Sequence, residues 1–328
     1  MNKLFGKLIF IRLSTSLLII FLVISFVFIL VRISPGSPVQ KFISPKLSPR
    51  LAEQVMESFS LHEPLYSQYF SFLGNVVQGD FGISYSFRAK VTDVIAKHIP
   101  VTFILAFFSI IIQLLLSLLL SLIAVRKLNG IVDNLISKSA LILFTVPSFV
   151  MGVFLILVFS VKLNLLPSSD LKSIDHYSYN FWNALADYAK HLILPLITLS
   201  AAGTAVFYKY LRDNIEVVLS KNFVLYLTAN GYSRWTIILK HVVPNSLGPL
   251  ISVAGVELGI LLSGTLITEV IFGLPGMGRL TIDAINSRDY PLIIGCTTIS
   301  AIFIVFANFA SDLIRAVIDK RILKESLS

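Results

Sequence analysis

The sequence predicts an all-α integral membrane protein with six transmembrane helices. The 328-residue chain is 55% hydrophobic and only 14% charged, with a mean hydropathy of +0.84, far from the composition of a soluble domain. Apolar runs of about 20 residues, the length that crosses a bilayer core, recur along it. The net charge of +9 comes from basic residues at the ends of these runs. Membrane orientation and contact with lipid therefore explain it better than binding of nucleic acid.

The first apolar run covers residues 8–31 and is preceded by Lys3 and Lys7, with Arg12 in its first part. A basic start before an apolar run is also typical of a secretory signal peptide. This run is too long for a signal peptide and lacks a small-residue cleavage site. We therefore expect residues 1–31 to form an N-terminus and a retained first transmembrane helix.

Residues 32–98 form a mixed polar segment that we expect outside the membrane. Pro35 and Pro38 break the first helix, because proline lacks an N–H donor and clashes with the preceding turn. Residues 51–59 and 66–77 have the pattern of amphipathic helices. The segment is too small and too aromatic to be an independent enzyme domain.

Residues 99–328 are predicted to hold the other five spans. Pro100 opens the second, over residues 101–125, near the first helical turn where its missing donor costs little. The third covers residues 135–161 and is interrupted at Pro147. A proline there predicts a kink, which either serves packing or lines a pathway as a hinge. The fourth span covers residues 192–210.

The fifth span, residues 247–271, carries two carboxylates, Glu257 and Glu269. A charge in hydrocarbon costs about 3 kcal/mol on insertion scales, so both should face protein or water. We treat Glu257, Glu269 and Pro147 as candidates for a translocation path. The alternative for each glutamate is a hydrogen-bonded packing role. The sixth span covers residues 291–310.

A glycine-rich stretch, residues 273–279, follows the fifth span. Its glycines are similar to those of a phosphate-binding loop, but the stretch lacks the Lys-Ser/Thr ending and a preceding soluble strand. We expect a tight external or re-entrant turn.

Cysteine and histidine usage argues against metal or catalytic chemistry. The single cysteine, Cys296, lies in an apolar run and is expected to be a small buried hydrophobe. The histidines have no ligand spacing, and no His/Asp/Glu constellation suggests a membrane enzyme. We therefore predict no catalytic residues and no metal site.

The segment between the fourth and fifth spans is the longest polar stretch in the second half of the chain. It contains two amphipathic pieces, residues 211–227 and 233–243, separated at Gly231. Gly231 is a natural helix stop, Ser233 a natural N-cap, and Pro244 a helix end. This pattern indicates either a docking element or an amphipathic loop that lies on lipid headgroups.

Six spans place both termini on one side, and the basic residues indicate which side is the cytoplasm. The segments on the side of the termini hold 15 basic residues, against 5 in the two short opposite loops. The 15 are Lys3, Lys7, Arg12, Arg126, Lys127, Lys138, Lys209, Arg212, Lys221, Arg234, Lys240, Arg315, Lys320, Arg321 and Lys324. The N-terminus, the C-terminus and the docking segment are therefore predicted to be cytoplasmic, and residues 32–98 external.

Short motifs in a fixed order along nearly the whole chain resemble those of one known family, the permease subunits of ABC importers of the dipeptide, oligopeptide and nickel type. The motifs are Arg32-Ile33-Ser34-Pro35-Gly36-Ser37-Pro38, Leu61 to Tyr69, Gly79-Asp80-Phe81-Gly82, Val146-Pro147-Ser148-Phe149, Leu165-Leu166-Pro167, Gly264, Glu269, Phe272, and Arg288-Asp289-Tyr290-Pro291. An external loop motif, Pro275, Gly276, Gly278 and Arg279 with Asp289, also matches. The resemblance implies the type I ABC importer permease fold.

In such permeases a Glu-Ala-Ala-x-x-x-Gly signature in the cytoplasmic loop docks on the ATPase subunit. Here Gly231 matches the glycine, whereas Leu225, Tyr226 and Leu227 replace Glu-Ala-Ala. The resemblance thus implies a coupling loop over about residues 211–245, resting on shape and apolar contact more than on charge. Its candidate residues are Asn222, Phe223, Leu225, Tyr226, Leu227, Gly231, Arg234, His241 and Asn245.

The resemblance also implies a function and partners. The chain would be a multi-pass subunit in the cytoplasmic (inner) membrane of a bacterium, working with a second homologous permease, two ABC ATPase subunits and an extracytoplasmic substrate-binding protein. It has no Walker A sequence, so ATP and Mg would be used by the partners, and no cofactor is expected on this chain. Peptides are the first expectation for the substrate, with nickel or a metal chelate as the alternative. An ion-coupled secondary transporter is the competing class.

Overall fold

The computed structural model describes residues 2–33 and 64–318. Within these ranges the regular structure is helical, apart from one isolated antiparallel bridge between Ile83 and Lys90. The predicted helix at residues 51–59, the prolines at 35 and 38, and residues 61–63 lie outside the described residues.

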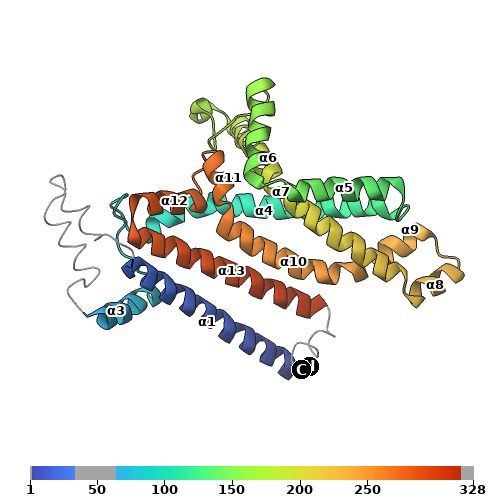
Figure 1. Ribbon diagram of the computed structural model, residues 1–328, viewed down its shortest axis with the longest axis horizontal. Coiled ribbons are helices and arrows are strands. Elements are labelled where there is room, and N and C mark those ends of the chain that lie inside the picture. Colours follow the sequence, from blue (N-terminus) through green and yellow to red (C-terminus); the bar gives the residue numbers. More distant parts are fainter. Residues whose placement is uncertain (1, 34–63, 319–328) are drawn as a thin grey trace.

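Four long helices share the long axis of the molecule (Figure 1). They are α1 (Asn2–Ile33), α4 (Val91–Val125), α10 (Val243–Gly264) and α13 (Tyr290–Ile318). The start of α1 and the end of α13 lie at the same end of the molecule as α8 (Asn222–Ala229) and α9 (Arg234–Ile237). The other end carries α3 (Leu65–Val77) and α12 (Met277–Ser287).

In residues 2–33 and 64–318, five helices are long and apolar enough to cross a membrane, and a sharply bent pair is a candidate for a sixth span. The five predicted spans other than the third correspond to these helices. Two boundaries were wrong. Pro100 lies inside α4, nine residues after its start at Val91, rather than in the first turn. The fourth span is part of α7 (Phe181–Leu219), a much longer helix.

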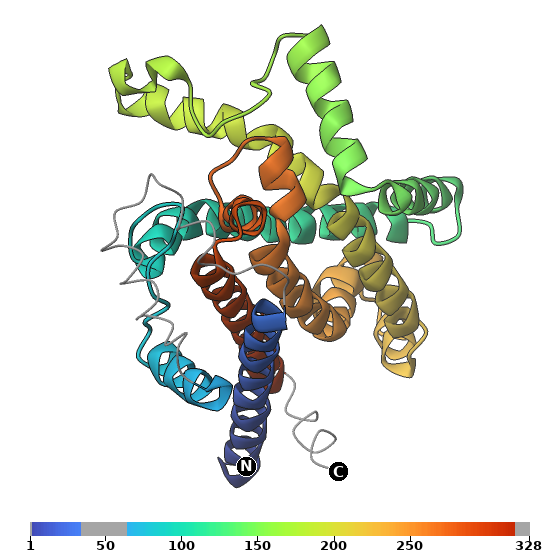
Figure 2. The same cartoon turned by 60° about the vertical axis from the view of Figure 1, so that its left-hand side comes forward.

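The third predicted span is a break rather than a kink. Helices α5 (Ile131–Thr145) and α6 (Ser148–Leu155), the latter continued by a π-helical segment (Ile156–Lys162), meet at 98°. Val146, just before Pro147, is extended with φ −76° and ψ 121°. A residue before proline avoids the helical region for steric reasons, so α5 ends there. As a result, α6 and the first part of α7 project from the body of the molecule (Figure 2).

Small residues bring the central helices together. On α7, Phe207, Leu211 and Ile215 are fully buried against α4 and α10. A Cβ on Gly203 of α7 would lie 2.3 Å from the Gln113 side chain of α4, so a larger residue would force the Gln113 amide to move. Close approach at small residues is how membrane helices gain van der Waals contact, because lipid is as apolar as the side chains it replaces.

Helix α10 ends at Gly264, and the short helix α11 (Leu266–Ile271) continues after Thr265 in a different direction (Figure 1). The predicted turn at residues 273–279 begins as expected, with Gly273 at φ +63°. The turn is short, however, because α12 starts at Met277. Met277, Leu280 and Ala284 are buried and recur at helical spacing, a pattern that predicts α12. The helix does not show in the sequence as an apolar run, because its outer face is polar.

Candidate functional site

The segment between α7 and α10 forms two short helices at one extreme of the molecule (Figure 1). The predicted helix at residues 211–227 is wrong, because α7 ends at Leu219 and α8 begins at Asn222. After α8, Gly231 takes φ +79°. Its N–H donates to the Thr228 carbonyl (3.0 Å), and the Tyr232 N–H donates to the Leu227 carbonyl (3.2 Å). This is the left-handed helix ending predicted for Gly231.

Helix α8 has no buried residue. Val224 and Leu227 pack partly against the core, whereas the Leu225 and Tyr226 side chains are 72% and 69% exposed. Phe223 is at the edge of exposure, at 36%. At this end of the molecule, α8 therefore packs one face against the core and exposes an apolar surface on the other. We call this exposed surface, formed by Leu225 and Tyr226, the knob.

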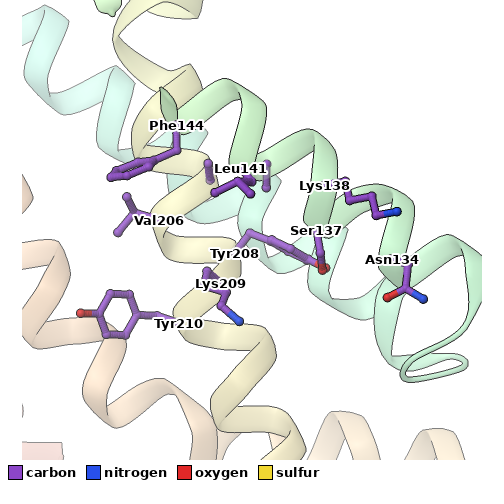
Figure 3. A pocket seen from close by; sticks show the side chains of 11 residues that line it. Asn134, Ser137, Lys138, Leu141, Phe144, Val206, Tyr208, Lys209 and Tyr210 are labelled. Carbon is purple, nitrogen blue, oxygen red and sulfur yellow. The ribbon is translucent and has the colours of Figure 1, made fainter. Parts of the chain in front are cut away.

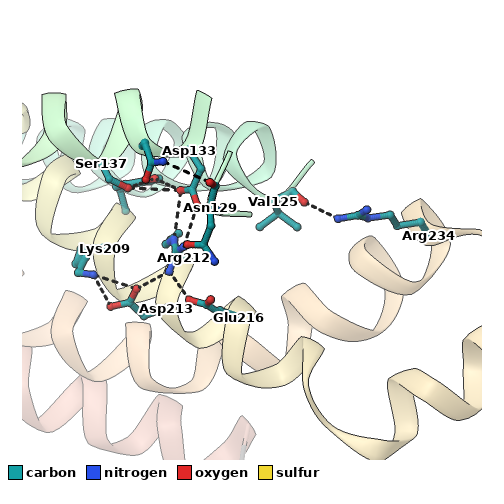
Figure 4. A network of polar contacts seen from close by, with 11 residues as sticks. Val125, Asn129, Asp133, Ser137, Lys209, Arg212, Asp213, Glu216 and Arg234 are labelled. Atoms are coloured by element: carbon teal, nitrogen blue, oxygen red, sulfur yellow. Dashed lines mark hydrogen bonds and ion pairs between the residues drawn. The ribbon is translucent and has the colours of Figure 1, made fainter. Parts of the chain in front are cut away.

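Helix α9 is tied to the end of α4. Ser233 caps α9 as predicted, by accepting a hydrogen bond from the Thr236 N–H (3.2 Å). The Arg234 guanidinium donates to the Val125 carbonyl at 3.0 Å (Figure 4). The Arg126 guanidinium lies 5.7 Å from the centre of the Trp235 ring, in cation–π range. The α8–α9 unit is thus mechanically connected to α4.

The chain does not leave the helical conformation at Pro244, contrary to the prediction. A π-helical segment (Ile238–Val242) joins α9 to α10, and Pro244 lies in the first turn of α10, where proline is tolerated. The Asn245 side chain donates to the His241 carbonyl at 2.6 Å, and the His241 ring contacts Tyr232 edge-on. These two predicted site residues therefore stabilise the base of the segment.

An ion-pair network that the sequence did not predict joins α7 to the turn between α4 and α5 (Figure 4). Arg212 of α7 is 9% exposed and Asp133 of α5 is 1% exposed. The Arg212 Nη2 lies 2.8 Å from Asp133 Oδ2 and donates to Asn129 Oδ1 at 3.0 Å. Tyr208 donates to Asp133 at 3.1 Å, and Glu216 binds the other side of the guanidinium. The one signal for this network in the sequence was Arg212 itself, because an arginine on the buried face of a helix requires a partner of opposite charge.

Glu269 of α11 is fully buried. Thr102 of α4 donates to it at 2.6 Å, the Arg279 backbone N–H donates at 3.0 Å, and Thr265 donates as well. A Cβ on Gly276 would overlap the carboxylate. This is the geometry of the packing alternative, and a path role for Glu269 stays a prediction.

The predicted external loop motif is gathered around Glu269. The Arg279 guanidinium donates to the Gly273 carbonyl, and a Cβ on Gly278 would lie 2.4 Å from the Leu266 Cα. Pro275 lies in the turn itself. The motif thus packs the start of α12 directly on α11.

Asp289, between α12 and α13, is also fully buried. Its carboxylate accepts from the Ser84 hydroxyl at 2.6 Å and from the Ser86 N–H at 2.8 Å. This contact fixes the loop before α4 to the start of α13.

Glu257 of α10 lies between helices rather than at a surface. It is half-buried, and its side chain lies against the Gln113 amide of α4. Gln113 also donates to the Leu199 carbonyl of α7 at 3.2 Å. Polar groups from α4, α7 and α10 thus meet within the spans, where an ionisable residue commonly marks a pathway. Pro147, the third path candidate, lies at the α5–α6 break.

Two histidines that appear unrelated in the sequence meet at one carboxylate. Asp187 of α7 lies 2.8 Å from His176 Nδ1 and 3.4 Å from His191 Nδ1, and it accepts two hydrogen bonds from Ser173. No group of three or more His, Cys, Asp or Glu side chains able to hold a metal is found in the described part of the chain. The cluster anchors the loop between the π-helical segment that follows α6 (Ile156–Lys162) and α7.

The fold and composition define a multi-pass membrane protein with an exposed apolar surface on a short helix at one end. Comparison with known proteins identifies the family. Residues 114–324 match the model of the binding-protein-dependent transport system inner membrane component, and residues 6–106 match its N-terminal counterpart. The chain belongs to this family, as the motifs predicted. It is a transport subunit, and ATP hydrolysis belongs to a separate partner.

Curated relatives align over almost their full length. The oligopeptide transport system permease protein AppB of Bacillus subtilis (strain 168) is 32% identical, with 90% of this chain and 92% of AppB covered. The dipeptide transport system permease protein DppB of Lactococcus lactis subsp. cremoris is 31% identical, with 95% and 97% covered. The glutathione transport system permease protein GsiC of Escherichia coli (strain K12) is 32% identical, with 92% and 94% covered.

Solved structures share the fold at low sequence identity. The inward-facing MetNI methionine ABC transporter aligns with a TM-score of 0.54 at 15% identity, covering 70% of this chain and 97% of that one. An amino acid ABC transporter crystallised with histidines aligns with a TM-score of 0.51 at 15% identity, covering 68% and 94%. These likenesses support the predicted type I importer architecture.

Proposed function

We propose that this chain is a permease subunit of an ATP-driven importer that moves di- or oligopeptides across the cytoplasmic membrane of a bacterium. The substrate class is supported by three relatives, named for oligopeptide, dipeptide and glutathione transport, that align over nearly their whole length. None of these three is named for a metal, so nickel or metal-chelate import is not favoured. Membership of a binding-protein-dependent family also argues against an ion-coupled secondary transporter.

The observation that carries the proposal is the exposed apolar surface of α8 at the end of the molecule that also holds the start of α1 and the end of α13. We assign this end to the cytoplasm because the segments on the side of the two termini hold the excess of basic residues. A groove on each ATPase partner would receive such a knob. This chain would bind no cofactor, since ATP and Mg belong to those partners.

The coupling would pass from α8 into the spans through two polar links. Arg234 joins α9 to the end of α4, and Arg212 joins α7 to the α4–α5 turn. The first link ends on the last residue of α4 and the second on the turn that follows it and the start of α5, so a push on α8 would move α4 and α7 together. The Glu257–Gln113 contact lies between these two helices and α10, and it would change as they tilt.

A second permease would cover the apolar surfaces that one chain leaves open. Ile131 on α5 is 88% exposed, and Phe181 at the start of α7 is 73% exposed. Helix α6 also projects from the body of the molecule (Figure 2). A homologous subunit packed there would complete the path, with a substrate-binding protein on the side of α12.

The docking step is tested by placing charge on the knob. The double variant Leu225→Asp/Tyr226→Asp should lose the ATPase subunit during purification in mild detergent, because two carboxylates in an apolar contact cost several kcal/mol. Peptide uptake should fall in parallel, while the protein still inserts. Val77→Asp is the matched control, an apolar side chain 87% exposed at the opposite end. Full retention of the ATPase by the double variant would rule out docking through α8.

A further inference from the structure

A cavity of about 730 Å³ lies between α5 and α7. It exists because Ala140 and Ala205, two small and buried residues, face each other across the helix pair. Its floor is rigid, since the Tyr208 hydroxyl is hydrogen-bonded to both Ser137 (3.0 Å) and Asp133 (3.1 Å). The cavity is open to the surroundings, because the lining side chain of Leu141 is 63% exposed.

The lining changes from polar to apolar along the cavity (Figure 3). Asn134, Lys138 and Lys209 lie at the end nearer α8, whereas Leu141 and Phe144 lie at the other. This order follows the helix directions, since α5 runs away from the α8 end and α7 runs toward it. The cavity thus has a cationic mouth and an apolar tail, along helices that belong to membrane-spanning segments.

We propose that this cavity binds one anionic phospholipid of the cytoplasmic leaflet, with its phosphate at Lys138 and Lys209 and one acyl chain along Leu141 and Phe144. Basic pockets between membrane helices on the cytoplasmic side suit anionic headgroups. The volume lies in the range of sites that enclose a small ligand.

The two lysines do not contribute equally. Lys209 is paired with Asp213 of its own helix at 3.0 Å, and Asp213 also contacts Arg212. Lys138 is exposed and makes no ion pair in the part of the chain that the structure describes. Lys138 therefore supplies most of the attraction for the phosphate, and Lys209 adds a second donor at the mouth.

A helix of the second permease is the competing occupant. Such a helix would place apolar side chains over Lys138 and leave an ammonium group desolvated without a counter-charge, which costs far more than contact with a headgroup. A phospholipid satisfies both ends of the cavity at once. Membrane lipid is also present at high local concentration wherever the cavity opens to the bilayer.

The proposal is tested on the purified transporter complex by native mass spectrometry, after exchange into phosphatidylglycerol or phosphatidylcholine. The unchanged complex should retain about one more phosphatidylglycerol than phosphatidylcholine. Lys138→Ala should weaken retention of phosphatidylglycerol about fivefold, because a basic residue at the membrane surface contributes about that factor. Leu141→Trp, a substitution at an exposed side chain, should fill the tail and reduce retention of both lipids.

Lys127→Ala is the matched control, since Lys127 is exposed at the same end of the molecule but does not line the cavity. It should retain the lipid. Equal retention of the two lipids by the unchanged complex, or undiminished phosphatidylglycerol in Lys138→Ala, would overturn the proposal. Absence of bound lipid in the complete complex would also overturn it and would assign the cavity to the second permease. Lipid counting is independent of uptake and of ATPase binding, so its outcome is separate from that of the docking experiment.

Discussion

Asp133 and Arg212 show how one buried ion pair fixes the geometry of several elements. Asp133 is almost inaccessible, yet every oxygen of its carboxylate has a donor, from Arg212, Tyr208 or the Asn129 backbone. A pair of this kind adds little net stability compared with an apolar pair, but removal of one partner leaves an uncompensated charge. Its role is therefore to fix α7 against the α4–α5 turn in one arrangement.

Asp133→Ala should lower the free energy of unfolding by about 3 kcal/mol, because Arg212 would stay buried without its main partner. The comparison is Arg12→Ala, which removes an exposed ion pair to Asp312 (3.1 Å) and should cost less than about 1 kcal/mol. Thermal unfolding of the two variants in the same detergent measures the difference. Equal losses would show that the Asp133 pair is not desolvated as the structure indicates.

Gly231 is required for its backbone conformation rather than for space. No atom lies within 4 Å of where its Cβ would be, and its φ is +79°. Gly231→Ala should therefore destabilise the α8–α9 turn by about 1 kcal/mol, and Gly231→Asn should cost less, since asparagine tolerates this region. Gly74, in helix α3 with equally open surroundings, is the control. Gly74→Ala should be neutral or stabilising, and a similar loss at both glycines would contradict the assignment.

At the scale of elements, α11, the turn after it and α12 form one unit built around Glu269. Thr102 holds the unit to α4, because its hydroxyl donates to Glu269 at 2.6 Å and accepts from the Met277 N–H at 2.8 Å. The glycines at 276 and 278 allow the backbone to approach. A substitution that only conserves the shape of the Glu269 side chain would therefore not keep these contacts, because every group that faces the carboxylate is a hydrogen-bond donor.

Glu269→Gln should destabilise the protein, because its amide NH₂ would face donors. Thr102→Val should also destabilise it, because the Met277 N–H would lose its acceptor and Glu269 would lose one of its donors. The two effects should not add. A double-mutant cycle on unfolding free energies should give a coupling of about 1 kcal/mol or more, as residues in one network do. Additive losses would mean that the two side chains act separately, and would restore the weight of a path role for Glu269.

For the whole molecule, the apolar runs predicted the order of the long elements, five of which are helices long enough to cross a membrane in the described part of the chain. Pro147 and Gly231 predicted two of the breaks. The 98° turn at Pro147 was not predictable. The pre-proline restriction ends α5, but the direction of α6 depends on contacts such as Gly152 against Phe272, more than a hundred residues away. The Asp133–Arg212 pair spans 79 residues and follows no local pattern. The α8 surface was predicted only in part: its residues were included in the amphipathic piece over residues 211–227 before Gly231, but the helix break after Leu219 was missed.

Docking of α8 on a cytoplasmic ATPase is tested most directly by cysteine labelling. The one native cysteine, Cys296, is fully buried, so a Tyr226→Cys variant carries a single accessible thiol. A membrane-impermeant maleimide should label it in the isolated permease, only from the cytoplasmic side, and at least about tenfold more slowly once the ATPase is bound. Val77→Cys, at the opposite end, should label at one rate in both states. Equal labelling of Tyr226→Cys with and without the ATPase, or labelling from the external side, would contradict the account.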